Sequence, residues 1–256
     1  MEVKNDWANS AEYYDLVLDK KQFTKNVEFI AKTLKEHDCK TVLELGCGSG
    51  LYLLQLKDQG FDIEGLDISK EMLEELFKLN PQATTHLTDM STFNLGKKYD
   101  AIICLTSSLV LLPNMEKIGE TFKRAQEHLN PEGIFILENP DHDVEIKESN
   151  HSQEIEHFNL DDGFIDIVFR QHKVKNKWVE EWFGFGFKNN DPIEFKERFE
   201  ELIVPSTKIS TSLKKYFIIE KSMALEQETY SLKENLEREA TSVNKNNHTT
   251  IFTTFS

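Results

Sequence analysis

The stretch at residues 41–50, TVLELGCGSG, constrains the fold more than any other part of the sequence. Its first half is an apolar run of the β type, and its second half carries glycine at every second position, Gly46, Gly48 and Gly50. Glycine has no Cβ, so these positions allow a tight turn and a close approach of the backbone to a ligand. Residues 51–56 have helical composition, and the free N–H groups at the start of such a helix face whatever lies over the glycines. The pattern predicts a strand, a ligand-binding turn and a helix in direct succession.

An acidic residue follows this turn at the distance that nucleotide-type folds use for a ribose contact. Residues 61–66 form a second β-type segment that leads to Asp67, about 20 residues beyond the glycines. NAD sites use the spacing G-x-G-x-x-G, whereas this chain has Glu44-x-Gly-x-Gly-x-Gly50. That pattern resembles motif I of the class I S-adenosylmethionine (SAM) methyltransferases. The resemblance implies that the loop cradles the methionine part of SAM and that Asp67 accepts both ribose hydroxyls. A structural glycine turn and another kind of nucleotide site stay open as alternatives.

The resemblance also assigns SAM contacts to residues that follow the other predicted strands. The run Thr88-Asp89-Met90 resembles the family position at which an acid accepts the exocyclic amine of adenine and the next side chain packs on the ring. An exposed loop aspartate without such a role is the alternative for Asp89. The complete set of predicted cofactor residues is Glu44, Gly46, Cys47, Gly48, Gly50, Asp67, Ile68, Asp89, Met90 and Leu105.

Segments of strand and helix type alternate through the first half of the chain. Apolar runs at residues 98–105 and 133–138 are typical of strands buried in a parallel sheet, and the amphipathic stretch 115–129 predicts a helix between them. Such alternation predicts a doubly wound, Rossmann-like α/β fold. Ligands in these folds lie beyond the carboxyl ends of the strands, which is where Asp67 and Glu138 fall.

We predict one domain with a mostly parallel seven-stranded sheet, a helical N-terminal cap and an inserted antiparallel β-ribbon. Apolar residues at helical spacing predict a cap helix over residues 7–37, and period-two alternation predicts the ribbon at 153–188. Residues 192–217 have the composition of mixed helix and loop. The predicted boundaries are 1–38 for the cap, 39–140 for the SAM-binding core, 150–190 for the ribbon and 191–256 for the completion of the sheet.

The C-terminal part completes the predicted sheet. Residues 216–223 resemble the sixth strand of the methyltransferase fold, and residues 249–255 resemble its reversed seventh strand. The polar stretch 226–248 between them predicts a weak helix and a loop, because its apolar stripe is thin.

The composition limits the partners that the chain can have. The net charge is −15 and the pI is near 5.0, whereas binding to phosphate backbones depends on Lys and Arg. The three cysteines have no metal-ligand spacing, which fits a reducing cytoplasm. No apolar run approaches the ~20 residues of a membrane span, and no signal-peptide pattern is present. We therefore predict a cytoplasmic protein that binds a small molecule, with no metal, nucleic acid or membrane as a partner.

Two further stretches resemble the N-methyltransferases that act on aminosugars and on glycine. The pair Tyr14-Asp15 resembles the Tyr-Asp opening of these proteins, and Leu105-Thr-Ser-Ser108 is similar to their loop after strand four. Thr106 stands where those proteins commonly carry an aromatic residue, which leaves the surroundings of the sulfonium open. The resemblance implies transfer of a methyl group to a small molecule, with an amine nitrogen as the acceptor, and a homodimer is possible.

An amine acceptor must lose a proton, and a nearby carboxylate or imidazole can take it. The loop after the fifth predicted strand offers Glu138, Asp141, His142 and Asp143. We predict His142 as the base and Tyr14 as the second catalytic residue. A solvated loop histidine without a catalytic role is the alternative for His142.

The aromatic residues of the predicted ribbon indicate a lid over the acceptor. In the family resembled, an extra sheet of this kind covers the active site, and Tyr13 and Tyr14 would complete the enclosure. Packing against the main domain is the alternative for most of these side chains. The ribbon aromatics in question are Trp178, Trp182, Phe183, Phe185 and Phe187.

Three other function classes are alternatives to methyl transfer to a small molecule. An NAD-linked oxidoreductase is disfavoured by the glycine spacing. A noncatalytic SAM-binding or regulatory protein stays open, because Thr106 and the C-terminal third depart from the family pattern. A nucleic-acid methyltransferase is disfavoured by the acidic charge and by the loop at residues 105–108, which lacks the Asn/Asp-Pro-Pro-aromatic pattern of amino-methylating enzymes of that kind.

Overall fold

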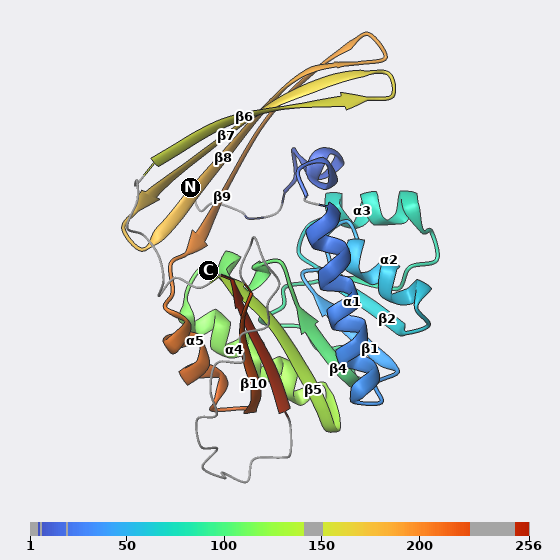
Figure 1. Cartoon of the computed structure of the whole chain (residues 1–256), viewed down its shortest axis with the longest axis vertical. Helices are drawn as coiled ribbons and strands as arrows, with labels where there is room; N and C mark the ends of the chain where they lie inside the picture. The colour runs from blue at the N-terminus through green and yellow to red at the C-terminus, as the bar shows by residue number, and fades with distance from the viewer. Residues whose placement is uncertain (1–4, 6, 19, 141–150, 226–248, 256) are drawn as a thin grey trace.

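The computed structural model describes residues 5, 7–18, 20–140, 151–225 and 249–255, which form two sheets (Figure 1). The larger sheet has the strand order β10-β11-β5-β4-β1-β2-β3, and the smaller one has the order β6-β7-β8-β9. Five parallel strands form the core of the larger sheet: β1 (Thr41–Leu45), β2 (Asp62–Asp67), β3 (Thr85–Leu87), β4 (Tyr99–Cys104) and β5 (Leu129–Pro140). The predicted Rossmann-like fold is confirmed by this core.

Two strands from the C-terminal part extend the sheet past β5. β11 (Thr249–Phe255) pairs with β5, and β10 (Ile218–Leu225) pairs with β11, both in parallel. The prediction of a reversed strand at 249–255 was therefore wrong. An alternating sequence fits either direction, and the intervening stretch 226–248 is longer than the dozen or so residues that a parallel return needs. That stretch, predicted as weak helix and loop, lies outside the described residues.

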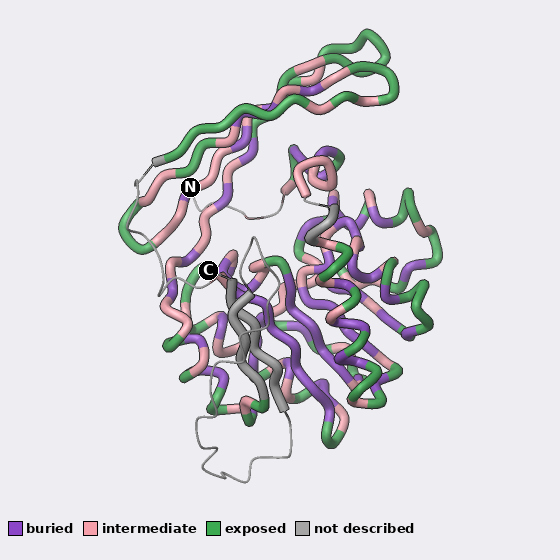
Figure 2. Tube along the Cα trace, viewed as in Figure 1, coloured by how far each residue is buried: buried purple, intermediate pink, exposed green. Residues whose placement is uncertain are grey.

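Helices cover both faces of the parallel sheet, as a doubly wound fold requires. They are α1 (Lys20–Glu36), α2 (Leu51–Asp58), α3 (Lys70–Leu79), α4 (Met115–Glu127) and α5 (Ser206–Leu213). The first three pack on one face and the last two on the other, and Figure 2 shows the central strands buried between them. Among the helices that the structure describes, none is long and apolar enough to cross a membrane.

The N-terminal segment is not the single helix that we predicted over residues 7–37. It forms a 3₁₀ helix, η1 (Ala11–Leu16), before α1 begins. Side chains of η1 pack against the antiparallel sheet, where Tyr13 stacks on Phe195 with 5.4 Å between ring centroids. The apolar face of α1 packs against the parallel sheet instead. One straight helix cannot contact both bodies, so the segment is divided.

The antiparallel sheet has four strands: β6 (His151–Leu160), β7 (Gly163–Val174), β8 (Lys177–Lys188) and β9 (Asp191–Leu202). β9 corrects the prediction of mixed helix and loop from residue 192 onward. Its apolar residues Ile193, Phe195 and Phe199 recur at even spacing, but the charged residues between them hide the pattern. Asn189 and Asn190, with φ of 53° and 67°, form the turn that joins β8 to β9, as in a type I′ hairpin.

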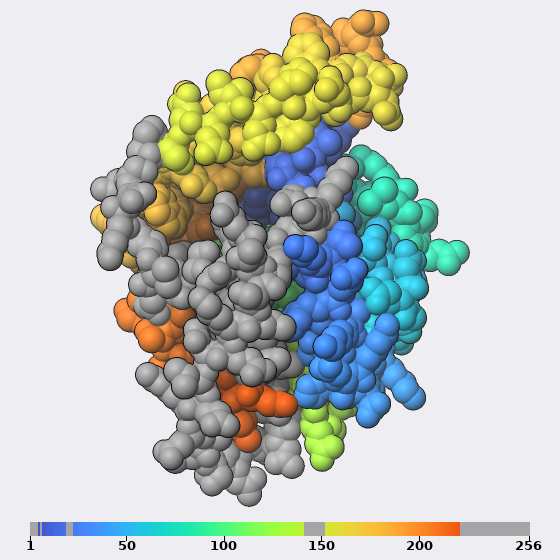
Figure 3. Space-filling model, viewed as in Figure 1, coloured from blue at the N-terminus to red at the C-terminus, as the bar shows by residue number. Residues whose placement is uncertain are grey.

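The antiparallel sheet stands over the carboxyl ends of the parallel strands, and η1 lies between the two (Figures 1 and 3). An aromatic and aliphatic core joins this sheet to the N-terminal segment, with Tyr13, Ile165, Ile167, Trp182 and Phe199 buried in it. The end of the fold at which Rossmann-like sheets bind ligands is therefore covered.

Candidate functional site

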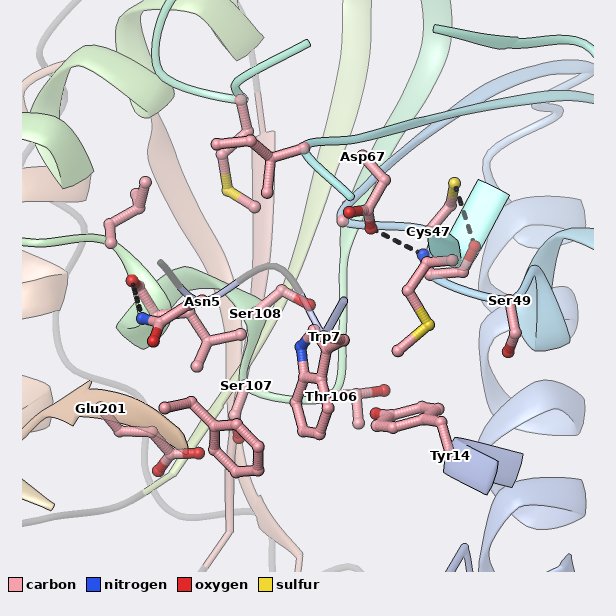
Figure 4. A pocket seen from close by; sticks show the side chains of 18 of the residues that line it. Asn5, Trp7, Tyr14, Cys47, Ser49, Asp67, Thr106, Ser107, Ser108 and Glu201 are labelled. Carbon is pink, nitrogen blue, oxygen red and sulfur yellow. Dashed lines mark hydrogen bonds between the residues drawn. The ribbon is translucent and has the colours of Figure 1, made fainter. Parts of the chain in front are cut away.

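A cavity of about 1130 Å³ lies between the carboxyl ends of the parallel strands and the antiparallel sheet. Its floor is formed by the segments that follow β1, β2, β3 and β4 and by the end of β5, and its cover is formed by η1, β8 and β9. Figure 4 shows side chains from these separate segments gathered around one space. The cavity thus brings together parts of the chain that are far apart in the sequence.

The glycine loop after β1 is fixed to the neighbouring strand and open toward the cavity. The backbone N–H groups of Gly46 and Cys47 donate to the carbonyl of Leu66 at 2.8 and 3.0 Å. Gly46 has φ +70°, and a Cβ added to it would lie 2.9 Å from the Ser108 side chain. Gly48 has φ +52°, and the nearest protein atom to an added Cβ is Met72 Sδ at 4.0 Å. The loop is packed at Gly46 and free at Gly48, where a ligand can approach.

Two of the predicted cofactor residues, Gly50 and Leu105, do not line the cavity. Gly50 has φ +83° at the start of α2, and a Cβ added there would collide with the Leu76 side chain of α3. Leu105 is buried in the core beneath the loop after β4. Both residues hold the cavity wall in place. Cys47 lines the cavity, but its thiol packs on Gly65, where an added Cβ would lie 2.5 Å from Sγ.

Two carboxylates lie at the glycine loop, of which Glu44 is buried and Asp67 is half-buried. Asp67 accepts hydrogen bonds from the backbone N–H groups of Gly48 and Ser69, both at 2.8 Å. Glu44 is 3% exposed, and its Oε2 has no hydrogen-bond partner within the described part of the chain. Burial raises the pKa of both carboxyls, and the charge of Asp67 raises the pKa of Glu44 further. A buried carboxylate oxygen without a donor fits a cationic group of a ligand.

These groups fit the SAM that the sequence resemblance implies. Glu44 would hold the ammonium group of its methionine part, and Asp67 would hold the ribose hydroxyls. Ile68 is apolar yet 57% exposed, and with Met90 it offers two apolar surfaces for an adenine ring. Asp89 lines the same part of the cavity, and one of its oxygens accepts the Ser91 N–H at 2.6 Å.

Glu138, at the end of β5, is a buried carboxylate that lines the cavity. Burial raises its pKa to about 7, and a hydrogen bond from the backbone N–H of Thr106 opposes part of that shift. Thr106 and Ser107 have φ of 50° and 58°, a left-handed conformation that costs non-glycine residues about 1 kcal/mol or more each. The loop after β4 therefore has an uncommon backbone conformation, in which the N–H of Thr106 donates a hydrogen bond to Glu138. A carboxylate that titrates near neutral pH is suited to proton transfer.

Of the two predicted catalytic residues, the structure describes Tyr14 but not His142. His142 lies outside the described residues, as do Asp141 and Asp143. Tyr14 lines the cavity, and burial, followed by the charges of Asp15 and Asp67, raises its pKa well above the usual range. Its phenol therefore keeps its proton and can donate a hydrogen bond, but it cannot act as a base.

The N-terminal segment is fastened to the glycine loop. Ser49 Oγ donates to the Asp15 carboxylate at 2.6 Å. The ring of Tyr14 lies edge-on to Trp7 with 4.8 Å between centroids, and it stacks on Trp182 at 6.4 Å. These contacts make η1 a part of the cavity cover.

The antiparallel sheet contributes a different set of residues from those predicted. Of the five ribbon aromatics, Trp182 lines the cavity, while Phe185 and Phe187 are exposed on the surface. Tyr13 packs in the core of that sheet and does not line the cavity. The lining residues that the sequence reasoning missed include Trp7, Glu180, Phe199 and Glu201. Period-two alternation in β9 was the signal that could have placed Phe199 and Glu201 on one face.

Comparisons with known proteins agree with this geometry. A family described as a methyltransferase domain matches residues 7–190, more than half of the chain. A dTDP-3-amino-3,6-dideoxy-alpha-D-glucopyranose N,N-dimethyltransferase of Streptomyces fradiae is 32% identical over 132 residues, which cover 50% of this chain and 52% of that protein. A glycine/sarcosine N-methyltransferase of Aphanothece halophytica is 32% identical over 132 residues, which cover 49% of this chain and 50% of that protein. The chain spans about half the length of these curated relatives.

Solved structures share most of this fold. DesVI of Streptomyces venezuelae has a TM-score of 0.72 at 22% identity, over 84% of this chain and 91% of that chain. A SAM-bound amino pentose methyltransferase of Micromonospora echinaspora has a TM-score of 0.67 at 19% identity, over 81% of this chain and 86% of that chain. At these identities the likeness shows the fold, and the family match carries the assignment. The chain belongs to the methyltransferase domain family, with SAM as the cofactor that its cavity fits.

Proposed function

We propose that the chain transfers a methyl group from SAM to an amine nitrogen of a small molecule. The observation that carries this proposal is the position of Glu138, a buried carboxylate with a pKa of about 7 in the same cavity as the glycine loop and Asp67. A base of that pKa suits the removal of a proton from nitrogen at neutral pH. The two relatives described above are N-methyltransferases by name, which supports the same acceptor atom.

The reaction needs two reactants held in line and one proton removed. SAM supplies a methyl group on a positively charged sulfur, so the carbon–sulfur bond breaks as the nitrogen–carbon bond forms. Glu44 and Asp67 hold the cofactor, so the methyl group is kept at a fixed place against the acceptor. The acceptor nitrogen needs a free lone pair to attack, so Glu138 takes a proton from its ammonium form before or during the transfer. The protein forms no covalent bond of its own in this scheme.

The cover over the cavity positions the acceptor and excludes water. Tyr14 keeps its proton and can orient the acceptor by donating a hydrogen bond. The bond from Ser49 to Asp15 keeps η1 closed over the glycine loop, and the antiparallel sheet covers the rest of the opening. A closed site prevents water from competing with the amine.

A screen with methyl-labelled SAM tests this proposal. The purified chain is incubated with small amines, alcohols, thiols, a polynucleotide and a bystander protein, and the labelled product is identified by mass spectrometry. Label on an amine nitrogen supports the proposal, and label on a hydroxyl, a protein or a polynucleotide contradicts it. SAM binding in calorimetry without any transfer supports a noncatalytic SAM-binding protein instead, and saturable NAD binding without SAM binding supports an oxidoreductase.

Replacing Asp67 with Ala should weaken SAM binding by about 10- to 150-fold. A hydrogen bond to a charged group contributes about 1.5–3 kcal/mol, and each 1.4 kcal/mol is about tenfold in affinity. Isothermal titration calorimetry measures the change. Asp62→Ala is the matched control, because Asp62 is exposed at the other end of the same strand and does not line the cavity. An Asp67→Ala variant with the melting temperature and SAM affinity of the wild type would show that another residue binds the ribose.

A further inference from the structure

The cavity is strongly acidic. Among the described residues that line it, one carries a positive charge, Lys177, and the Nζ of that lysine is paired with Glu200 at 2.7 Å. The lining carboxylates come from both the cofactor end and the antiparallel sheet: Glu44, Asp67, Asp89, Glu138, Glu180, Glu200 and Glu201. SAM carries positive charge at its ammonium and its sulfonium, which accounts for the carboxylates at the glycine loop. The carboxylates contributed by β8 and β9 lie in the cover and need another explanation.

Among the described residues of β8 and β9 that line the cavity, Glu201 is the carboxylate without a protein partner in the described part of the chain. Glu180 accepts from Trp182 Nε1 at 2.6 Å and from Gln171 Nε2 at 3.0 Å, and Glu200 is held by Lys177 and Arg198. Within the described part of the chain, the Glu201 carboxylate has no hydrogen bond and no ion pair. Surrounding protein desolvates it, and the surface that it keeps faces the cavity, where Figure 4 shows its side chain.

Aromatic rings stand in the same wall of the cavity as Glu201. Trp7 lies against Phe199 with 4.0 Å between ring centroids and edge-on to Trp182 at 5.2 Å. All three rings line the cavity, and Phe199 precedes Glu201 by two positions on β9, so both side chains lie on one face of the sheet. Phe199 and Trp182 are buried and support the indole of Trp7, which is half-buried. A carboxylate beside a partly exposed indole suits an organic ammonium group, which gains from both the charge and the ring face.

Two other kinds of ligand do not suit this wall. A metal ion needs several ligands around one point, and no group of three His, Cys, Asp or Glu side chains in the described ranges could hold one. A phosphate or pyrophosphate is bound by Arg, Lys or clustered N–H groups, whereas the one lysine among the described lining residues is already paired with Glu200. The acceptor that fits is cationic and carries no phosphate.

We propose that Glu201, with Trp7, binds a second ammonium group of the acceptor, so that the substrate is a phosphate-free small molecule with at least two amino groups. This inference rests on the proposed function, because the first amino group is the one methylated near Glu138. It differs from the nucleotide-linked sugar in the name of the Streptomyces fradiae relative, whose substrate carries a diphosphate. The second amino group of the acceptor pairs with Glu201 and is not methylated there.

Three acceptors test this inference with methyl-labelled SAM: a free diamino hexose, the hexosamine that lacks the second amino group, and a nucleoside-diphosphate-linked hexosamine. The wild type should have its lowest KM for the diamino hexose. Glu201→Gln should raise that KM by about tenfold or more, the scale of a lost hydrogen bond to a charged group, and leave kcat, the KM for SAM and the KM for the plain hexosamine unchanged. Glu194→Gln is the matched control, because it removes the same charge from an exposed position of β9 outside the cavity.

Calorimetry on the protein loaded with S-adenosylhomocysteine gives a second readout that needs no turnover. The diamino hexose should bind the wild type more tightly than the hexosamine does, and the difference should vanish in Glu201→Gln. A preference for the nucleotide-linked sugar, or an equal effect of Glu201→Gln on both free sugars, overturns the inference while leaving N-methylation in place. Transfer to none of the amines overturns the proposed function as well.

Discussion

Replacing Glu138 with Gln should lower kcat by about 10²–10⁴-fold, the scale of a lost general base, without changing the affinity for SAM. Glutamine has nearly the same shape and can still accept the Thr106 N–H, but its amide cannot take a proton. The loop after β4 should therefore keep its conformation, with Thr106 and Ser107 at positive φ. Single-turnover measurements with labelled SAM isolate the transfer step from product release.

The pH dependence gives this prediction a second test. Because burial raises the pKa of Glu138 to about 7, its basic carboxylate form increases as the pH rises from 6 to 8. The wild-type rate should therefore show a step upward over that range. The acceptor amine also gains reactivity as it loses its proton, and that rise should persist in Glu138→Gln while the step near pH 7 disappears.

Two further variants decide what a change at Glu138 means. Glu132→Gln lies on the same strand, in an exposed position away from the cavity, and should have wild-type rates. His142→Ala tests the base that we predicted from the sequence, which lies outside the described residues. Full activity of Glu138→Gln together with a loss of about 10²–10⁴-fold in His142→Ala would return the role of base to the histidine.

The cofactor end of the cavity could be predicted from the sequence because its determinants are local. A strand, alternate glycines and an acid about 20 residues later fix a turn and a carboxylate at one sheet edge, whatever the rest of the chain does. Glu44, Gly48 and Asp67 accordingly line one cavity. Gly50 belongs to that stretch and Leu105 follows β4, but both pack against the core, because the packing of α3 and of the sheet decides what they contact.

The acceptor end could not be predicted to the same extent, since burial and strand pairing decide it. Glu138 and His142 are both polar residues after an apolar run, and only the fold shows that Glu138 is buried in the cavity wall. Glu201 lies in a segment so rich in charge that it did not read as a strand. Pairing with β8 makes β9 a strand and brings its inward face over the cavity. Trp7 is the first residue of the predicted cap helix, but its position depends on long-range contacts with Trp182 and Phe199.

Replacing Gly48 with Val should abolish SAM binding and leave the fold in place. An added Cβ at Gly48 meets no protein atom closer than 4.0 Å, so the cost to the folded chain is the left-handed backbone at φ +52°, which costs about 1–2 kcal/mol for a side chain with a Cβ. The branched side chain would instead occupy the space at the glycine loop where the cofactor approaches. Micromolar affinity corresponds to about 8 kcal/mol of binding free energy. Because the valine side chain blocks the cofactor at the loop, calorimetry should detect no heat of SAM binding.

Gly96→Val separates this effect from backbone strain. Gly96 has φ +66°, an added Cβ there meets nothing within 4 Å, and the residue does not line the cavity. Both variants should therefore lose a similar amount of thermal stability, while Gly96→Val alone keeps SAM binding. Gly46→Ala should lose stability as well as binding, because its Cβ would lie 2.9 Å from Ser108. If Gly48→Val bound SAM as tightly as Gly96→Val, the glycine loop would not be the place where this chain holds its cofactor.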